Sequence, residues 1–227
     1  MTADELYQQA FRAEIAGLKP ASLCDVGCGT GALLAHAQSL GIVAAGVEPD
    51  PAKVAEANGH GLDIHQGTAE ALPFPDGAFD LVTFENSLHH VTEIGRGLAE
   101  AMRVARRAVV IVDPWFDLSI PSQAVGDRYE RWMKALDRMT GMVHWDPIAA
   151  GEIAAACSGS SVTVRHLLQL TPMSTEAFEY FAGRAQPLKD SPVYRANAMD
   201  QELSAIRAQF QSTGITEAGA LLVAVLK

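Results

Sequence analysis

The chain of 227 residues is acidic and moderately apolar. At about 100 to 200 residues per domain, this length fits one domain with room for a large insertion. Hydrophobic residues make up 48% and charged residues 19%, which supplies enough apolar surface for a core and excludes intrinsic disorder. The formal net charge is −10 and no stretch gathers Lys and Arg into a stripe, so we expect no direct nucleic-acid binding.

The cysteine content and the first residues of the chain indicate the cellular compartment of the protein. Three cysteines are too few for a disulfide framework or a four-ligand zinc site, which favours a reducing environment. Residues 1–7 show neither a basic nor an apolar leader region, and the longest apolar runs are far shorter than a membrane span. We therefore expect a soluble, cytoplasmic protein with no membrane partner.

Strands alternate with helices over residues 1–113. Helical periodicity predicts a first helix that closes at Gly17, and Asp50 before Pro51 predicts an N-cap followed by proline at the first helical position. Continuous apolar strands between helices imply a doubly wound α/β core, with a parallel sheet covered on both faces. The apolar runs that predict its first five strands are residues 22–26, 42–47, 62–65, 80–84 and 108–112.

After Pro114 the composition changes and aromatic residues become frequent. We expect a single domain in which residues 1–113 form the ligand-binding core. Residues 114–146 and 171–215 are expected to form an aromatic-rich helical cap over it. Residues 147–170 and 216–227 would complete the core, with strands at 161–170 and 220–226, giving a mostly parallel seven-stranded sheet.

A glycine-rich turn joins the first strand to its helix. Glycine lets the backbone approach a ligand closely and tolerates positive φ, and the helix N-terminus adds N–H donors. The pattern is ambiguous alone, because Gly27, Gly29 and Ala32 also fit the dinucleotide pattern G-x-G-x-x-G/A, with Glu48 near the place of a ribose-binding acid. Asp25, two positions before the first glycine, suits a cationic amino group better than a pyrophosphate.

Several segments in order at the expected spacing resemble a known family. The resemblance is to the class I S-adenosylmethionine (SAM) dependent methyltransferases of the small-molecule "methyltransferase type 11" kind, and it covers about residues 22–113 and the terminal strand. The matching segments are residues 25–31 (Asp-Val-Gly-Cys-Gly-Thr-Gly), 46–50 (Gly-Val-Glu-Pro-Asp), 69–82, 88–91 (Leu-His-His-Val) and 100–104 (Glu-Ala-Met-Arg-Val).

The resemblance implies SAM as the cofactor and places particular residues against it. The glycines of the turn would wrap its methionine part, Asp25 would lie near its amino group, and Glu48 would take both ribose hydroxyls. Ala69 would offer its N–H to the adenine, and Thr68 or Glu70 would meet the adenine edge, although relatives often carry Asp where this chain has Thr68. The full set is Asp25, Gly27, Cys28, Gly29, Gly31, Glu48, Pro49, Thr68, Ala69, Glu70 and Glu85.

Catalytic candidates follow from topology, because ligands of an open α/β sheet bind outside the C-terminal ends of the strands. The candidates there are Glu85, His89, His90 and Asp113. An imidazole titrates near neutral pH and suits a general base, but the paired histidines also occur in relatives with different substrates, which favours a structural role. We expect no metal, because the other histidines show no ligand spacing and suit surface or packing positions: His36, His60, His65, His144 and His166.

Aromatic residues indicate the kind of substrate. Clustered rings beside a cofactor cleft suit a flat or apolar small molecule, and the alternative is that the rings are the core of the insertion. The expected substrate contacts are Tyr7, Phe11, Trp115, Tyr129, Trp132 and Trp145.

The expected function is methyl transfer from SAM, by in-line displacement, to an O, N or C nucleophile of a small metabolite, with S-adenosylhomocysteine (SAH) as the product. The alternatives are a protein methyltransferase, a non-catalytic SAM-binding protein and, more remotely, an NAD-dependent oxidoreductase. The acceptor atom, the need for a base and the oligomeric state stay open at this point.

Overall fold

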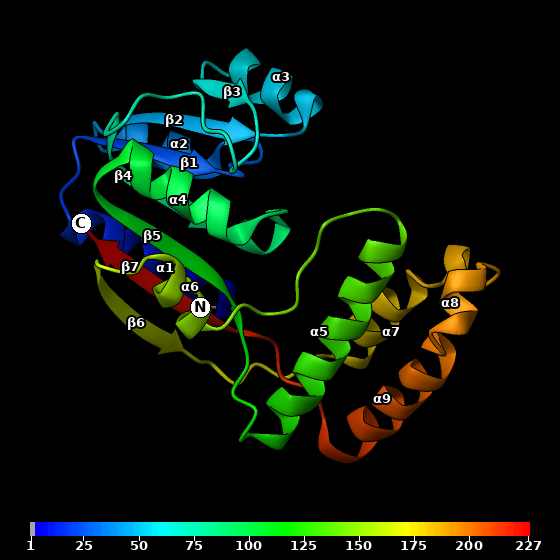
Figure 1. The fold of residues 1–227 in the computed structure, drawn as a ribbon. Coiled ribbons are helices and arrows are strands. Elements are labelled where there is room, and N and C mark those ends of the chain that lie inside the picture. The colour runs from blue at the N-terminus through cyan, green and yellow to red at the C-terminus, as the bar shows by residue number, and fades with distance from the viewer. Residues whose placement is uncertain (1–2) are drawn as a thin grey trace.

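The computed structural model describes residues 3–227, which form a seven-stranded sheet flanked by helices (Figure 1). The strand order is β3-β2-β1-β4-β5-β7-β6. Strand β7 runs antiparallel to both of its neighbours, whereas the pairs on the β5 to β3 side are parallel, which confirms the predicted fold class. The strands are β1 (Ser22–Val26), β2 (Val43–Glu48), β3 (Ile64–Gln66), β4 (Phe79–Glu85), β5 (Ala105–Trp115), β6 (Ser161–Leu167) and β7 (Gly219–Leu226).

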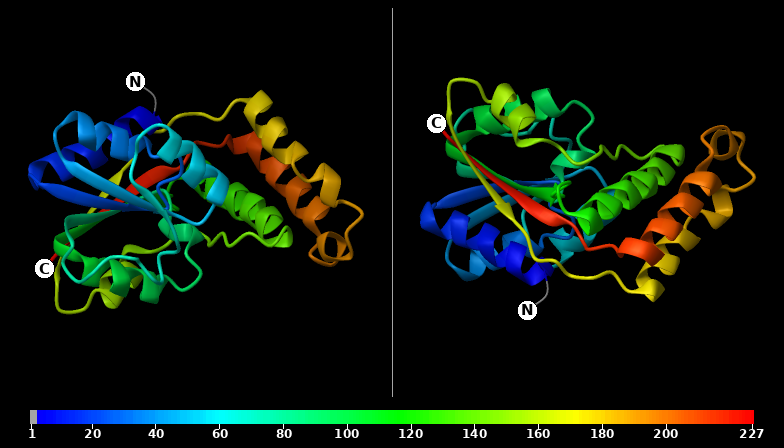
Figure 2. Two further views of the ribbon diagram at one scale, coloured as in Figure 1. Left: turned by 90° about the horizontal axis from the view of Figure 1, so that it is seen from above. Right: turned by 90° about the horizontal axis from the view of Figure 1, so that it is seen from below.

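Helices cover both faces of the sheet (Figure 2). One face carries α1 (Ala3–Gly17), α2 (Ala32–Ser39) and α3 (Pro51–Gly59), and the other carries α4 (Ile94–Val104) and α6 (Ala150–Ala156). Successive residues of a strand point to opposite faces, so Leu23 packs in one core cluster and its neighbour Cys24 in the other. Burial on both sides explains why the central positions of these strands are mostly apolar.

Most predicted strands differ by one residue or more in their limits, and β5 extends three residues beyond the expected 108–112 at each end. The third strand was expected at residues 62–65 but is β3, which begins only at Ile64, and the expected strand 161–170 ends at Leu167. The start of β3 is set by Asn58, whose carboxamide accepts from the backbone N–H of Ile64 and donates to its carbonyl, both at 3.0 Å. None of the helices in residues 3–227 combines the length and the apolarity that crossing a bilayer requires.

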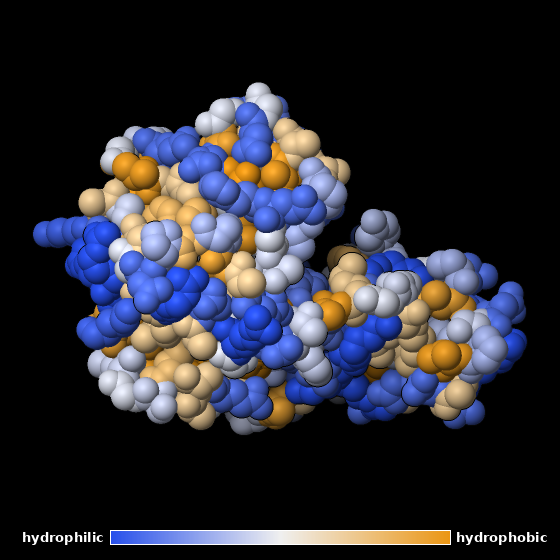
Figure 3. Space-filling view, turned by 45° about the horizontal axis from the view of Figure 1, so that its top comes forward, coloured by the Kyte–Doolittle hydropathy of each residue, from blue (hydrophilic) through white to orange (hydrophobic). Residues whose placement is uncertain are grey.

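A helical unit lies beside the sheet and forms a lobe of its own (Figures 1 and 3). It consists of α5 (Pro121–Met139), α7 (Thr175–Gly183), α8 (Pro192–Ala196) and α9 (Met199–Thr213), with a separate hydrophobic core. Two short 3-10 helices complete the described elements, η1 (Leu88–His90) and η2 (Gln186–Leu188).

Aromatic rings fill the interior of this helical unit. Tyr129 is fully buried and its hydroxyl donates to the carbonyl of Phe178 at 2.5 Å, while the indole N–H of Trp132 donates to the carbonyl of Met199 at 3.0 Å. Tyr129 stacks between Trp132 and Phe178, with ring centroids 5.8 and 4.5 Å away. The expected substrate contacts by Tyr129 and Trp132 are therefore corrected: these two rings hold the helices of the unit together.

A conservative substitution tests this packing role. We expect Tyr129→Phe to lower the free energy of unfolding by about 0.5 to 1.5 kcal/mol, because it removes one buried hydrogen bond and keeps the ring. Urea unfolding of the two proteins measures the difference, and SAM affinity should stay unchanged. An unaltered unfolding midpoint together with weakened SAM binding would instead place Tyr129 at the ligand site.

Candidate functional site

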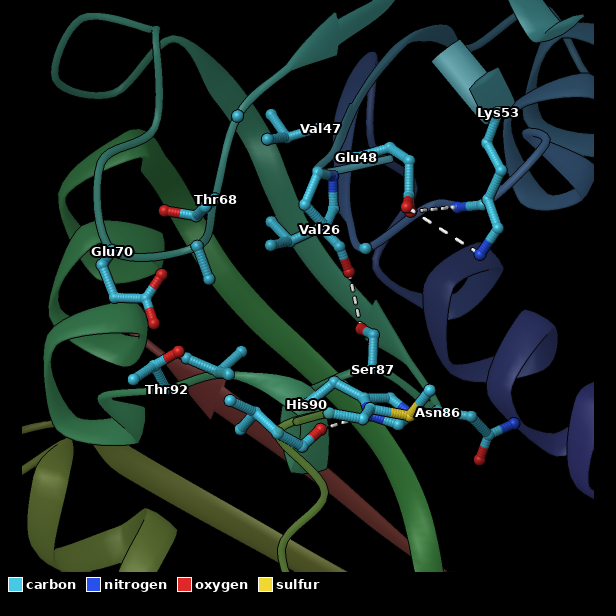
Figure 4. Close-up of a pocket in the computed structure, with 18 residues that line it drawn as sticks. Val26, Val47, Glu48, Lys53, Thr68, Glu70, Asn86, Ser87, His90 and Thr92 are labelled. Atoms are coloured by element: carbon cyan, nitrogen blue, oxygen red, sulfur yellow. Dashed lines mark hydrogen bonds and ion pairs between the residues drawn. The ribbon is translucent and has the colours of Figure 1, made fainter. Parts of the chain in front are cut away.

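A cavity of about 530 Å³ opens at the C-terminal ends of β1, β2 and β4 (Figure 4). Its volume lies within the roughly 300 to 1,000 Å³ of small-molecule sites, and its position is the edge at which open α/β sheets bind ligands. Glu48 and Lys53 lie on one side of the cavity, and Thr68, Glu70 and Thr92 lie on the other.

The glycine turn after β1 is held in place from two sides. The N–H of Gly27 donates to the carbonyl of Val47 at 2.8 Å, and the hydroxyl of Ser87 donates to the carbonyl of Val26 at 2.6 Å. Gly27 has φ 71°, and a Cβ there would lie 2.6 Å from the Cβ of Ser87. Only glycine fits this close approach, and as a result the backbone of Gly27 and Gly29 forms part of the cavity wall.

Three residues expected at the cofactor lie behind the wall of this cavity. The Cys28 thiol packs against the sheet, since its sulfur lies 2.5 Å from where a Cβ of Gly46 would be, and burial raises its pKa to about 12. Gly31 is the N-cap of α2, with φ 85°. Asp25 lies within β1, below the turn. Cys28 is therefore a packing residue in this structure.

Glu48 ends β2 and is 5% exposed. One carboxylate oxygen accepts from the N–H of Gly29 at 2.9 Å and the other from the N–H of Asp50 at 3.1 Å. The ammonium of Lys53 lies 3.9 Å away. These contacts fix the carboxylate at the cavity wall, and each oxygen keeps a lone pair for a further donor.

Asp25 is a buried acid that contacts no cation among the residues that the structure describes. Its carboxylate accepts from the hydroxyl of Thr83 at 2.8 Å. Burial raises the pKa of Asp25 to about 8, and the nearby charges of Glu85 and Glu48 raise it further against the effect of the Thr83 bond. Without a bound cation, the neutral form of Asp25 is therefore favoured below the glycine turn up to about pH 8.

Residues 68–70 form the opposite wall of the cavity. The carboxylate of Glu70 accepts from the N–H of Glu93, at the start of α4, at 3.1 Å. Burial disfavours its ionised form, but the hydrogen bonds from Glu93 and its neighbours outweigh burial and hold the pKa of Glu70 below its usual value. Thr68, Ala69 and Glu70 all line this wall, and the carboxylate of Glu70 is held by the start of α4.

The paired histidines of η1 have different surroundings. His89 is buried, and its Nδ1 lies 2.5 Å from the carboxylate of Asp113, which is 1% exposed. His90 lines the cavity, and its Nδ1 donates to the carbonyl of Val143 at 2.8 Å. Burial lowers the pKa of His90, so the imidazole facing the cavity is neutral at pH 7. His90 is therefore the member of the pair that lines the cavity.

The segment between α5 and α6 folds back onto η1, which the sequence did not indicate. Trp145 fixes it there: its backbone N–H donates to the carbonyl of His89 and its indole N–H to the carbonyl of Val91, both at 2.8 Å. Met142 and Val143 thereby enter the cavity wall. The same segment brings His144 to the paired histidines, although it was expected at a surface or packing position.

A smaller cavity of about 180 Å³ adjoins the first, and other residues that the sequence analysis expected at the site line it. Glu85 and Tyr7 line it, and Asn86 lines both cavities. Burial raises the pKa of Glu85. Phe11 is fully buried between α1 and the sheet, and so its expected contact with substrate is corrected to a core position.

Trp115, at the end of β5, lies outside the walls of both cavities. Its ring packs against His166, with 4.3 Å between ring centroids. Trp115 therefore packs against the edge strand β6 of the sheet. The sequence analysis did not identify three residues of the larger cavity: Ser87, Lys53 and Met142. They come from a loop, a helix and an insertion, and no motif links them.

Comparison with known proteins agrees with this geometry. Residues 24–112 match the sequence profile of a family described as "Methyltransferase domain". An ajmaline N-methyltransferase from Rauvolfia serpentina is 32% identical over 130 residues, which cover 52% of this chain and 45% of that enzyme. The chain spans about half or less of the length of this and two further curated relatives.

Solved structures share the fold over nearly the whole chain. The YcgJ protein from Bacillus subtilis superposes with a TM-score of 0.62 at 20% identity and covers 91% of both chains. A SAM-dependent methyltransferase from Archaeoglobus fulgidus gives a TM-score of 0.62 at 13% identity and covers 100% of this chain and 95% of its own. Residues 24–112 therefore match a methyltransferase domain, and the chain shares its fold with a solved SAM-dependent methyltransferase.

Proposed function

We propose that this protein binds SAM in the 530 Å³ cavity and transfers its methyl group to a nucleophilic O, N or C atom of a small molecule. The observation that carries the proposal is the pair of acids on either side of the glycine turn. Glu48 presents a fixed carboxylate to the cavity, and Asp25 is a buried acid against which residues 3–227 place no cation. A ligand that carries a diol and an ammonium group would satisfy both.

Glu48 would bind the ribose hydroxyls. A carboxylate held by two backbone N–H groups is oriented before the ligand arrives, so its ordering costs little on binding. Its free lone pairs accept from two neighbouring hydroxyls, and these bonds to a charged acceptor are among the stronger ones. Thr68 and the backbone of Ala69, across the cavity, would then meet the adenine.

Asp25 would interact with the methionine amino group through the glycine turn. A cation nearby stabilises the ionised carboxylate, so the cost of burying Asp25 is offset only in the complex. A nicotinamide dinucleotide would bring its pyrophosphate to this place, where no ammonium group would then stabilise the ionised form of Asp25. The electrostatics therefore favour SAM over NAD.

The sulfonium of SAM supplies an already activated methyl group, so the protein's task is to align the acceptor and exclude water. His90, Met142 and Val143 form the wall at which an acceptor would lie. The neutral imidazole of His90 could take a proton from a hydroxyl or amine, whereas His89 is bound to Asp113 and would position its neighbour. Glu85 in the adjoining cavity is the second candidate base.

Titration calorimetry tests the cofactor assignment. We expect SAM and SAH to bind with one site per chain and NAD not to bind. Binding of NAD, or the failure of both SAM and SAH to bind, would contradict the assignment. The small acceptor is supported by the 530 Å³ size of the cavity and by the small-molecule name of the Rauvolfia relative.

A further inference from the structure

Three imidazole rings meet beside the cofactor cavity. His89 and His90 come from η1, and His144 comes from the segment after α5. The ring centroids of His89 and His144 are 5.0 Å apart, and that of His90 lies 4.3 and 4.4 Å from them. One nitrogen of each ring lies within 4.8 Å of one nitrogen of each other ring.

Each ring has its Nδ1 bound to an acceptor. Nδ1 of His89 lies 2.5 Å from Asp113, and Nδ1 of His144 lies 2.8 Å from Asp137. Nδ1 of His90 lies 2.8 Å from the carbonyl of Val143, which can only accept, so this nitrogen carries the proton. With the proton on Nδ1 in all three rings, each Nε2 keeps its lone pair. Histidines that bind metals usually donate their other ring N–H to a carboxylate or a carbonyl in the same way.

Charged groups of both signs surround the rings, and the guanidinium of Arg138 donates to the carbonyl of His144 at 2.6 Å. The buried carboxylates of Asp113 and Asp137 contact two of the rings, and one oxygen of Asp113 has no hydrogen-bond partner among the described residues. The opposing cation is Lys134, which is buried, with its ammonium 3.6 Å from Glu130. Arg184 is paired with Asp137.

We propose that His89, His90 and His144 bind one divalent transition-metal ion of the zinc type through Nε2. Three imidazoles suit zinc and its neighbours, whereas magnesium and calcium take oxygen ligands. Bonds of about 2.0 to 2.1 Å in a tetrahedral site would hold the nitrogens about 3.4 Å apart, so the rings draw together on binding. His90 reaches the cavity wall, which leaves the fourth position open to the acceptor side.

The metal would join two parts of the chain at the acceptor wall. It would fix residues 140–149 against η1, and with them Met142 and Val143 in the cavity wall. An acceptor hydroxyl or thiol at the fourth position would lose its proton more readily beside the cation. This second role rests on the proposed methyl transfer, whereas metal binding itself does not. With the Nε2 of His90 bound to the metal, the metal would take the place of His90 as the group that helps the acceptor lose its proton.

The site is tested by measuring zinc binding to the full chain after a chelator has removed any bound metal. Equilibrium dialysis should show one tightly bound zinc ion per chain, with affinity falling at least tenfold in His144→Ala and unchanged in His60→Ala, which removes an exposed histidine elsewhere. Excess magnesium should not compete. Equal zinc binding by wild type and His144→Ala, or no binding to the wild type, would overturn the proposal.

Cobalt binding to the wild-type chain gives a second readout that does not depend on a variant folding. Cobalt in a site with three nitrogens and an open position should give intense visible absorption that zinc abolishes, whereas the weak absorption of hexa-aqua cobalt would contradict the site. SAM binding is measured on the same samples. Zinc binding without SAM binding would defeat the proposed function alone, and SAM binding without zinc binding would defeat this inference alone.

Discussion

Replacing Glu48 with Ala is expected to weaken SAM binding by about 1.5 to 3 kcal/mol, roughly 10- to 150-fold, because a charged acceptor of two ribose hydroxyls is lost. The carboxylate also accepts from the N–H groups of Gly29 and Asp50, so its removal loosens the turn as well. Titration calorimetry with SAM and SAH measures the effect.

The matched control for this variant is Glu56→Ala, which removes an exposed acid from α3 and changes the net charge equally. We expect it to bind SAM as the wild type does. A Glu48→Ala protein with wild-type affinity for SAM would show that the ribose does not lie at the end of β2.

Asp25→Asn is expected to have opposite effects on stability and on cofactor binding. The folded protein holds the proton of Asp25 more tightly than the unfolded chain, because burial raises its pKa from 3.8 to about 8. Its contribution to stability is therefore fully present below pH 3.8 and is lost as the pH rises toward 8. The Asn variant should gain stability over the wild type across this window, by up to about 1.4 kcal/mol per pH unit.

The same variant should bind SAM at least about tenfold more weakly, because the negative charge that faces the amino group is gone. Thermal unfolding from pH 5 to pH 8, with and without SAM, measures both effects, and Asp63→Asn serves as the control at an exposed acid. A variant that is less stable at pH 8 than the wild type, or that binds SAM equally well, would contradict the role given to Asp25.

The sheet could be predicted because each of its features is local. Apolar runs mark buried strands, and Asp50 with Pro51 marks the start of α3, where the Asp50 side chain does accept from the N–H of Ala52 at 2.8 Å. The glycine turn and Glu48 were found in the same way, since backbone geometry and a strand end place them. A short linear pattern was enough to bring both to the cavity wall.

Other parts of the site depend on contacts that no linear pattern carries. His144 meets His89 and His90 only because Trp145 fixes its segment onto η1. The role of Ser87 follows from its close approach to Gly27 across two strands.

Aromatic content misled the prediction of substrate contacts by Tyr129 and Trp132 for a related reason. In the sequence alone, an aromatic residue that packs a helical core cannot be distinguished from one that lines a pocket. Tyr129 and Trp132 are of the first kind, because each buries its ring and satisfies its polar atom on a neighbouring backbone carbonyl. Only the tertiary structure separates the two.

Methyl transfer from labelled SAM tests the central claim most directly. The purified protein is incubated with methyl-labelled SAM and with separate small-molecule and macromolecular fractions of an extract, and Glu48→Ala serves as the blank. We predict that label enters a compound of the small-molecule fraction and that the blank leaves it unlabelled. Label in protein or nucleic acid would contradict the proposed substrate class, and SAM binding without any labelled product in either fraction would contradict catalysis.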